Sequence, residues 1–302
     1  MTAFLLRRVA FVSLLVLAVT SVSFVLVHTA PGDFFTDFAP GAERRAAAGR
    51  AAAGMDRPLP VRYAAWLGRA ARFDLGTSLK FQRPVRELVV PRMRSTALLG
   101  ILALVLAIAA GVPLGVLTAT GDGGMLRTLV RAASSAVLAV PPLVVALVLT
   151  AAAARFGWLP PPGLELANIL VPALALALPA AAVIERTHSQ AVRAALGRPY
   201  IRATIARGVS WPAVVWKHAQ RDAFGATLGW YGVLAGTLLS GSFAVELIAD
   251  WPGLALLTAE AVRARDPSLV CGCAAAAAVL LAGAVLLSDL LHFWADPTVS
   301  ER

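Results

Sequence analysis

Six stretches of this chain are apolar over lengths that match the hydrocarbon core of a membrane. They lie at about 9–28, 96–119, 128–153, 167–184, 223–248 and 269–294. A helix needs about 20 residues to cross roughly 30 Å of hydrocarbon, and lipid offers no hydrogen-bond partner to an open backbone. We therefore expect an all-α integral membrane protein with about six transmembrane helices.

The composition supports this expectation and argues against a nucleic-acid-binding role. Of the residues, 59% are hydrophobic and 15% are charged, with a mean hydropathy of +0.75, whereas soluble domains carry about 25% charged residues. The formal charge of +10 comes almost wholly from arginine, since Lys80 and Lys217 are the only lysines. The arginines lie between apolar runs without a recognition motif, so membrane topology and lipid head groups explain the charge better than nucleic acid does.

The placement of arginine predicts the orientation of the chain. Arg7 and Arg8 precede the first apolar run and no small-x-small cleavage site follows it, so we interpret this run as an uncleaved first span with a cytoplasmic N-terminus. Six spans then leave the C-terminus in the cytoplasm as well. The segment 186–222 becomes a cytoplasmic loop with seven basic residues and one acid, as the positive-inside rule requires.

This layout divides the chain into a first transmembrane helix (1–28), an extracytoplasmic loop region with short helices (29–95) and a core domain with five spans (96–302). The region 29–95 also carries arginines, but it exceeds the loop length for which the positive-inside rule is reliable. Residues 73–78 are typical of a turn. An amphipathic helix that begins near Pro58 or Pro60 is predicted by apolar residues at helical spacing, namely Leu59, Tyr63, Trp66, Leu67 and Ala70.

The common catalytic motifs are missing from the sequence. A P-loop needs a Gly-Lys pair followed by Ser or Thr to hold phosphates, and neither lysine stands in such a motif. A serine nucleophile needs a positioned base, but His292 is predicted at the opposite end of the membrane from Ser240 and Ser242, which suit a helix–helix contact. We expect no catalytic residue, no metal site and no cofactor in this chain.

Other reactive residues have ordinary explanations. Cys271 and Cys273 lie inside an apolar run without further ligands nearby, which favours packing in a membrane helix over a metal site. Glu185, Arg186 and Glu246 fall at predicted span edges, where side chains can extend to water. We therefore assign them no role toward a substrate.

The loop 186–222 has a helix–glycine–helix pattern. The run from Tyr200 to Arg207 has helical character, and Gly208 follows where a left-handed cap is favoured. Ser210 suits an N-cap before a second helix that continues to about Arg221. Its surface carries Tyr200, Trp211 and Trp216 among the arginines. That composition is typical of a protein–protein interface, although positive-inside arginines with interfacial tryptophans would explain it equally well.

Short motifs follow one another along nearly the whole chain. In order they are Arg7-Arg8, Pro31-Gly32-Asp33, Arg57-Pro58-Leu59, Asp74-Leu75-Gly76-Thr77-Ser78, Arg83-Pro84-Val85, Gly111-Val112-Pro113-Leu114-Gly115, Gly157-Trp158-Leu159-Pro160, Tyr200-Ile201-Arg202, Ala206-Arg207-Gly208, Trp251-Pro252-Gly253-Leu254, Arg265-Asp266-Pro267 and Asp296-Pro297. Their order and spacing resemble the permease subunits of importer-type ABC transporters, in the dipeptide, oligopeptide and nickel branch. The loop 186–222 is similar to the EAA loop of that family.

The resemblance implies the fold of a type I ABC importer transmembrane domain in a bacterial inner membrane. It also implies a second permease, two cytoplasmic ATPase subunits that bind ATP and Mg, and an extracytoplasmic substrate-binding protein. The loop would be the coupling helix that docks an ATPase, through Tyr200, Arg202, Ala203, Thr204, Arg207, Gly208, Trp211 and His218. Contact with the binding protein would fall on Pro31, Gly32 and Asp33.

The chain departs from the family pattern at four positions. Arg207 replaces a lysine, Thr204 an alanine and Asp222 an asparagine, and Phe34 stands where a proline is usual. The substrate stays open among peptides, nickel and other small solutes. A secondary transporter or channel would require pseudo-symmetric halves, which the sequence does not show, and a membrane scaffold would explain the loop only as an interface.

Overall fold

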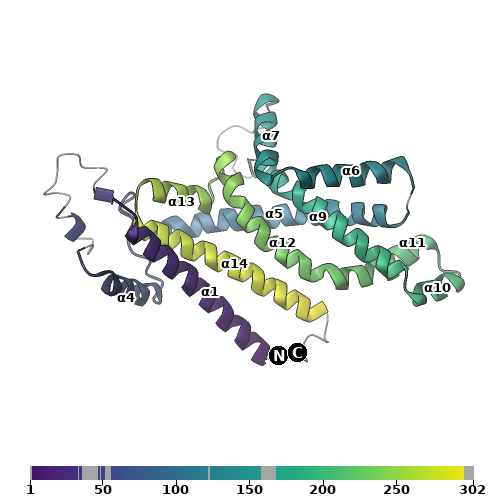
Figure 1. The fold of residues 1–302 in the computed structure, drawn as a ribbon, viewed down its shortest axis with the longest axis horizontal. Coiled ribbons are helices and arrows are strands. Elements are labelled where there is room, and N and C mark those ends of the chain that lie inside the picture. Colours follow the sequence, from purple (N-terminus) through teal and green to yellow (C-terminus); the bar gives the residue numbers. More distant parts are fainter. Residues whose placement is uncertain are drawn as a thin grey trace. The chain divides into compact units, whose positions relative to one another are not determined.

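The computed structural model describes residues 2–32, 34–35, 47, 49–51, 56–121, 123–157 and 168–295. Regular structure in these residues is helical apart from one bridge between Thr77 and Pro84 (Figure 1). Five of the described helices are long and apolar enough to cross a membrane, and a bent pair raises the number to six if it counts as one span. The chain forms two compact units, Thr2–Thr96 with Pro252–Ala282, and Ala97–Trp251 with the segment from Gly283.

In the first unit, the predicted amphipathic helix is α4 (Leu59–Ala70). Its apolar face packs with Phe24 of α1 (Thr2–Thr29) and with Cys271 of α14 (Pro267–Ala295). The Tyr63 and Ser21 hydroxyls are hydrogen-bonded at 2.5 Å. All five apolar positions that predicted the helix belong to this cluster, so the prediction is confirmed. Both cysteines are buried and free, as expected for packing residues.

The predicted turn after α4 is fastened to the start of α14 by one buried carboxylate. Phe73 and Gly76 have positive φ angles of 60° and 83°, which reverses the chain. Asp266, which is fully buried, accepts hydrogen bonds from Ser78 Oγ at 2.6 Å, from the Lys80 amide at 3.1 Å and from the Leu269 amide at 3.1 Å. Three donors offset the cost of burying that charge, and they bring two separate sequence motifs together.

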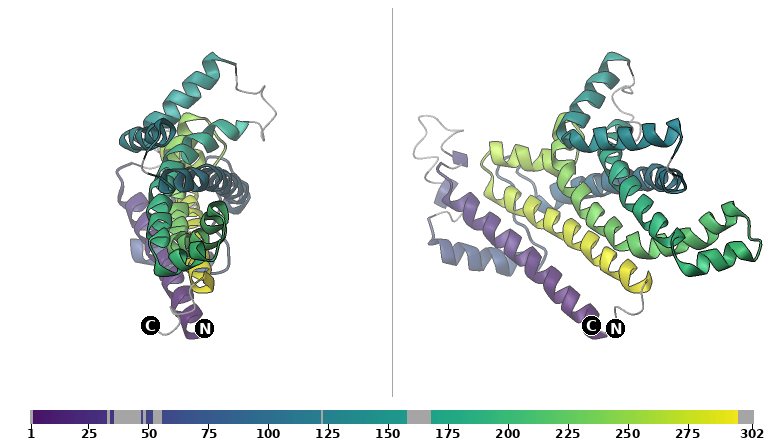
Figure 2. Two further views of the ribbon diagram at one scale, coloured as in Figure 1. Left: turned by 90° about the vertical axis from the view of Figure 1, so that its right-hand side faces the viewer. Right: turned by 45° about the vertical axis from the view of Figure 1, so that its right-hand side comes forward.

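The second unit contains the bent pair. The apolar run predicted as a span over 128–153 is bent: α6 (Met125–Ala139) and α7 (Pro142–Arg155) meet at 104° (Figure 2). Pro141 disfavours a helical conformation in the residue before it, and Val140 is accordingly extended with ψ 128°. Pro142 then opens α7 at a position where no amide donor is needed.

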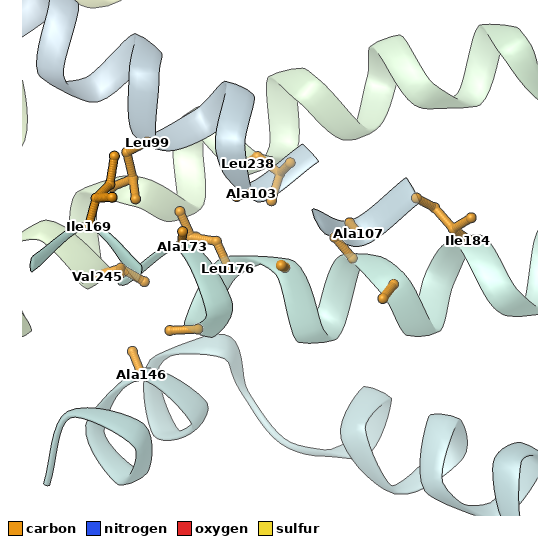
Figure 3. Packing of buried hydrophobic residues seen from close by; sticks show 14 of the residues in the cluster. Leu99, Ala103, Ala107, Ala146, Ile169, Ala173, Leu176, Ile184, Leu238 and Val245 are labelled. Carbon is orange, nitrogen blue, oxygen red and sulfur yellow. The ribbon is translucent and has the colours of Figure 1, made fainter. Parts of the chain in front are cut away.

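The core of the second unit lies between α5 (Val85–Ala119), α9 (Leu170–Leu196) and α12 (Gln220–Ile248). Figure 3 shows buried residues of the three helices in this core: Leu99, Ala103 and Ala107 of α5, Ala173, Leu176 and Ile184 of α9, and Leu238 and Val245 of α12. A Cβ atom at Gly111 would lie 2.8 Å from the Ala181 carbonyl oxygen, and one at Gly115 would lie 3.0 Å from the Glu185 oxygen. The two glycines therefore let α5 and α9 approach closely.

This close approach predicts that Gly111→Ala destabilises the protein although alanine favours a helix. The added methyl group must push α5 away from the α9 backbone, whereas Gly283→Ala in α14 meets no atom within 4 Å and should be neutral or stabilising by up to about 1 kcal/mol. Thermal unfolding of the purified protein in detergent measures both effects. A Gly111→Ala midpoint at or above that of Gly283→Ala would contradict the packing.

Candidate functional site

The helix–glycine–helix loop forms a sharp elbow at Gly208. Its first arm is α10 (Pro199–Ala206), with Pro199 at the first helical position. The Gly208 amide donates to the Ile205 carbonyl at 2.9 Å and the Val209 amide to the Thr204 carbonyl at 3.4 Å, which is the Schellman pattern. Gly208 has a φ of +81°, a conformation that costs a side chain about 1–2 kcal/mol. The predicted glycine cap is confirmed.

The second arm differs from the prediction in its end and in its form. Ser210 stands at the N-cap and its carbonyl accepts from the Val214 amide at 3.0 Å, but its side chain makes no capping bond. The arm begins as α11 (Trp211–Ala213), continues as a π-helix η1 (Val214–Ala219) and runs into α12 without a break. The predicted end near Arg221 was therefore wrong. π-Helical turns are rare and often occur at functional sites.

The two arms pack on each other and on the end of α9. Ile201 and Val214 are fully buried in a cluster with Ala195 and Ala219. The sequence also predicted that the loop starts near Arg186, but α9 remains helical to Leu196, so the elbow stands on a rigid continuation of that helix (Figure 2). Figure 1 shows α10 and α11 at the end of the second unit where α9 stops.

Asp222 ties the first arm to the base of the second. Its Oδ2 accepts from Arg198 Nη1 at 2.9 Å and from the Tyr200 hydroxyl at 2.7 Å. Sequence reasoning noted this residue only as a departure from the family pattern. Burial and the hydrogen bond to the Asp222 carboxylate raise the pKa of Tyr200 above its ordinary range. The contact therefore favours the neutral tyrosine.

The proposed contact residues of the elbow divide between its surface and its interior. Thr204 is buried and bonds back to the Tyr200 carbonyl, and His218 is half-buried. Six others are exposed: Tyr200, Arg202, Ala203, Arg207, Gly208 and Trp211. Ile205 and Trp216, at 45% and 56% exposed, extend the same set of accessible apolar groups. The elbow thus presents aromatic, apolar and cationic groups together, which is the composition of interface cores.

A buried polar network joins the second arm to α9. His188, which is fully buried, has Nε2 3.1 Å from Gln220 Oε1, and its Nδ1 lies 3.3 Å from the Tyr231 hydroxyl and 3.4 Å from Thr227 Oγ1. Gln220 is the first residue after the π-helix. Buried hydrogen bonds are costly to leave unmade, so these contacts hold α12 and α9 in one register. The sequence offered no local signal for them.

The prediction that two glutamates at span edges extend to water was wrong. Glu185 and Glu246 do not extend to water but are 4% and 0% exposed. Glu185 Oε1 accepts from Thr118 Oγ1 of α5 at 2.5 Å. Arg186, by contrast, is exposed as expected.

The second predicted contact region lies after α1. Pro31 and Gly32 are exposed and line a cavity of about 540 Å³ with Arg62 and Arg265. Gly32 has a φ of +81°, and a side chain there would collide with the Arg265 guanidinium. Asp33 lies outside the described residues.

Membrane-length helices with a packed elbow between α9 and α12 are the arrangement expected of an ABC importer transmembrane subunit. The fold resembles a chain of the MetNI methionine ABC transporter, solved in inward-facing conformations, with a TM-score of 0.52 at 19% identity over 72% of this chain and 96% of that one. Residues 111–301 match the family described as binding-protein-dependent transport system inner membrane component. The chain belongs to this family.

Two relatives match along essentially their whole length. The oligopeptide transport system permease protein AppB of Bacillus subtilis (strain 168) is 29% identical, over 99% of each chain. The dipeptide transport system permease protein DppB of Escherichia coli (strain K12) is 29% identical, over 100% of each chain. The present chain is a multi-pass inner-membrane permease subunit. Such subunits are non-catalytic, carry no cofactor of their own and work with ATPase and binding-protein partners.

The link between Tyr200 and Asp222 makes a pH-dependent prediction. Because the folded-state pKa of Tyr200 is raised, the stabilisation from this contact is complete below about pH 10 and is lost as the pH rises through the raised value. Asp222→Asn removes the negative charge and should return the Tyr200 pKa toward 10.0. Ultraviolet titration of tyrosinate, with Tyr200→Phe to assign the signal, measures this change. Identical curves for Asp222→Asn and wild type would contradict the contact.

Proposed function

We propose that the elbow 198–222 docks a cytoplasmic ATPase subunit and transmits its movement to the membrane helices. The observation that carries the proposal is the joint exposure of Tyr200, Ile205 and Trp211 with Arg202 and Arg207 on a loop that is otherwise well packed. Solvent-exposed aromatic residues on a rigid, basic support suit a cleft in another protein. Family membership supports an ATPase as that protein.

The path for this movement runs through the base of the elbow. Val215 of the π-helix packs with Val116 of α5 and Val192 of α9 in one buried cluster. The His188 network adds directional contacts between α9 and α12. A packed core passes on displacement because it has little free volume. Closure of the ATPase subunits would therefore move α5, α9 and α12 together, as alternating access requires.

For the substrate, we propose peptides, taken from an extracytoplasmic binding protein and passed along a path shared with a second permease. Support comes from the full-length likeness to oligopeptide and dipeptide permeases. In this arrangement two ATPase subunits bind ATP and Mg, and Pro31, Gly32 and Asp33 contribute to the contact with the binding protein. Mass spectrometry of the ligand that copurifies with that protein tests the class, and a nickel complex in place of a peptide would refute it.

For the topology, both termini lie in the cytoplasm and the region 29–95 faces outward, ahead of a core domain over 96–302. This requires α6 and α7 to count as one broken span. An arginine-rich elbow on the cytoplasmic side agrees with the positive-inside rule.

A pair of glycine variants tests the elbow. Gly208→Val forces a β-branched residue into a left-handed conformation and should distort the docking surface, while Gly197→Val, at the other end of α10, occupies an ordinary helical conformation with φ −75°. A strain of 1–2 kcal/mol predicts an uptake loss of about five- to thirtyfold for Gly208→Val. Uptake and ATPase activity are measured separately in the assembled complex. Normal uptake by Gly208→Val would refute the coupling role.

Introduced cysteines test the topology. The native Cys271 and Cys273 are buried, so they should not react with a membrane-impermeant maleimide. Arg72→Cys and Ala206→Cys place thiols at exposed positions. In intact cells only the thiol at position 72 should be labelled, and position 206 should react after lysis. The reverse pattern, or labelling of both in intact cells, would contradict the orientation.

A further inference from the structure

A cavity of about 330 Å³ lies between α6 and α9 in the second unit. It is separate from the exposed groups of the elbow. Its lining consists of three arginines, three serines, one glutamate, one glutamine and one leucine: Arg131, Ser134, Ser135, Leu138, Glu185, Arg186, Ser189, Gln190 and Arg193. Three guanidinium groups against one carboxylate give the lining a net positive charge.

The only carboxylate of the lining, that of Glu185, is held inside the protein by a hydrogen bond. Glu185 is buried at 4% exposed and its Oε1 accepts from Thr118 Oγ1. The Thr118 carbonyl accepts from Arg131 Nη2 at 2.6 Å and from Arg193 Nη2 at 2.9 Å. These contacts fix the two arginines and the glutamate at the floor of the cavity. Arg186 is exposed, and no hydrogen bond or ion pair is found for it among the described residues.

One apolar side chain lines the cavity beside the cations. Leu138 is 37% exposed and stands two turns beyond Arg131 on the same face of α6. A soluble anion would gain nothing from this side chain. A phospholipid offers both parts, a phosphate for the arginines and serines and an acyl chain for Leu138. Basic pockets between membrane helices bind anionic head groups in this way.

We propose that this cavity binds the head group of an anionic phospholipid. The phosphate is held by Arg186 with the serine hydroxyls, beside Arg131 and Arg193, and an acyl chain lies against Leu138 of α6. The site couples lipid binding to the junction of α5, α6 and α9, because Arg131 and Arg193 both donate to the Thr118 carbonyl at the end of α5.

Native mass spectrometry of the full-length protein, together with any copurifying subunits, tests this proposal. Detergent-purified protein is titrated with phosphatidylglycerol and separately with phosphatidylethanolamine. Arg186→Gln removes one cation from an exposed position and should weaken phosphatidylglycerol binding about fivefold. Ser135→Trp fills the cavity without changing the charge and should abolish the specific binding. Arg221→Gln, an exposed arginine outside the lining, should bind as wild type does.

Several results would overturn the proposal. Equal binding by Arg186→Gln, Ser135→Trp and Arg221→Gln would show that lipid binds elsewhere. Equal affinity for the two lipids would remove the role of charge, and displacement by millimolar inorganic phosphate alone would identify a free-anion site. A photo-cross-linker at position 135 that captures the second permease instead of lipid would show that protein fills the cavity. Unfolding midpoints of the variants within error of wild type establish that binding, and not folding, has changed.

Discussion

The carbonyl groups at the end of α5 need hydrogen-bond partners within the protein, because this part of the helix is buried and Thr118 is fully so. Arg127 Nε donates to the Leu117 carbonyl at 3.0 Å, and Arg131 and Arg193 both donate to that of Thr118. Cations also suit the negative end of a helix dipole. Three helices are thereby joined at one point, where α5 ends, α6 begins and α9 passes.

The elbow stands on this junction. Val116 and Ala119 at the end of α5 directly flank the two residues with capped carbonyls, and they pack with Val215 and Ala223 at the base of the second arm. The His188 network then fixes α12 against α9. The elbow is therefore connected to the membrane helices by buried packing and by buried hydrogen bonds. The breaks in the fold follow the same logic, since Pro141 and Pro142 need no amide partner at the bend between α6 and α7.

Sequence patterns predicted the parts of the structure that are determined by residues close together in the sequence. The spacing of Leu59 to Ala70 was enough for α4, and the isolated Gly208 was enough for the elbow. The extent of α9 was missed because Glu185 and His188 resemble loop residues until their partners on α5 and α12 are known. The hydrogen bonds of Asp222 were not predicted for the same reason, because Arg198 and Tyr200 come close to it only after the chain has turned. The bend at Pro141 had a local signal, which the apolar run concealed.

Transmission through a rigid loop requires that the two arms of the elbow, α10 and η1, move as one body. Spin labels at Ala206→Cys and Lys217→Cys, both exposed and one on each arm, report the distance across Gly208 by double electron–electron resonance in the assembled transporter. Two arms that move as one body give the same narrow distance distribution with and without bound ATP, while uptake remains ATP-dependent. A distribution that broadens or shifts with nucleotide would show that the elbow flexes at Gly208, and would contradict transmission through a rigid loop.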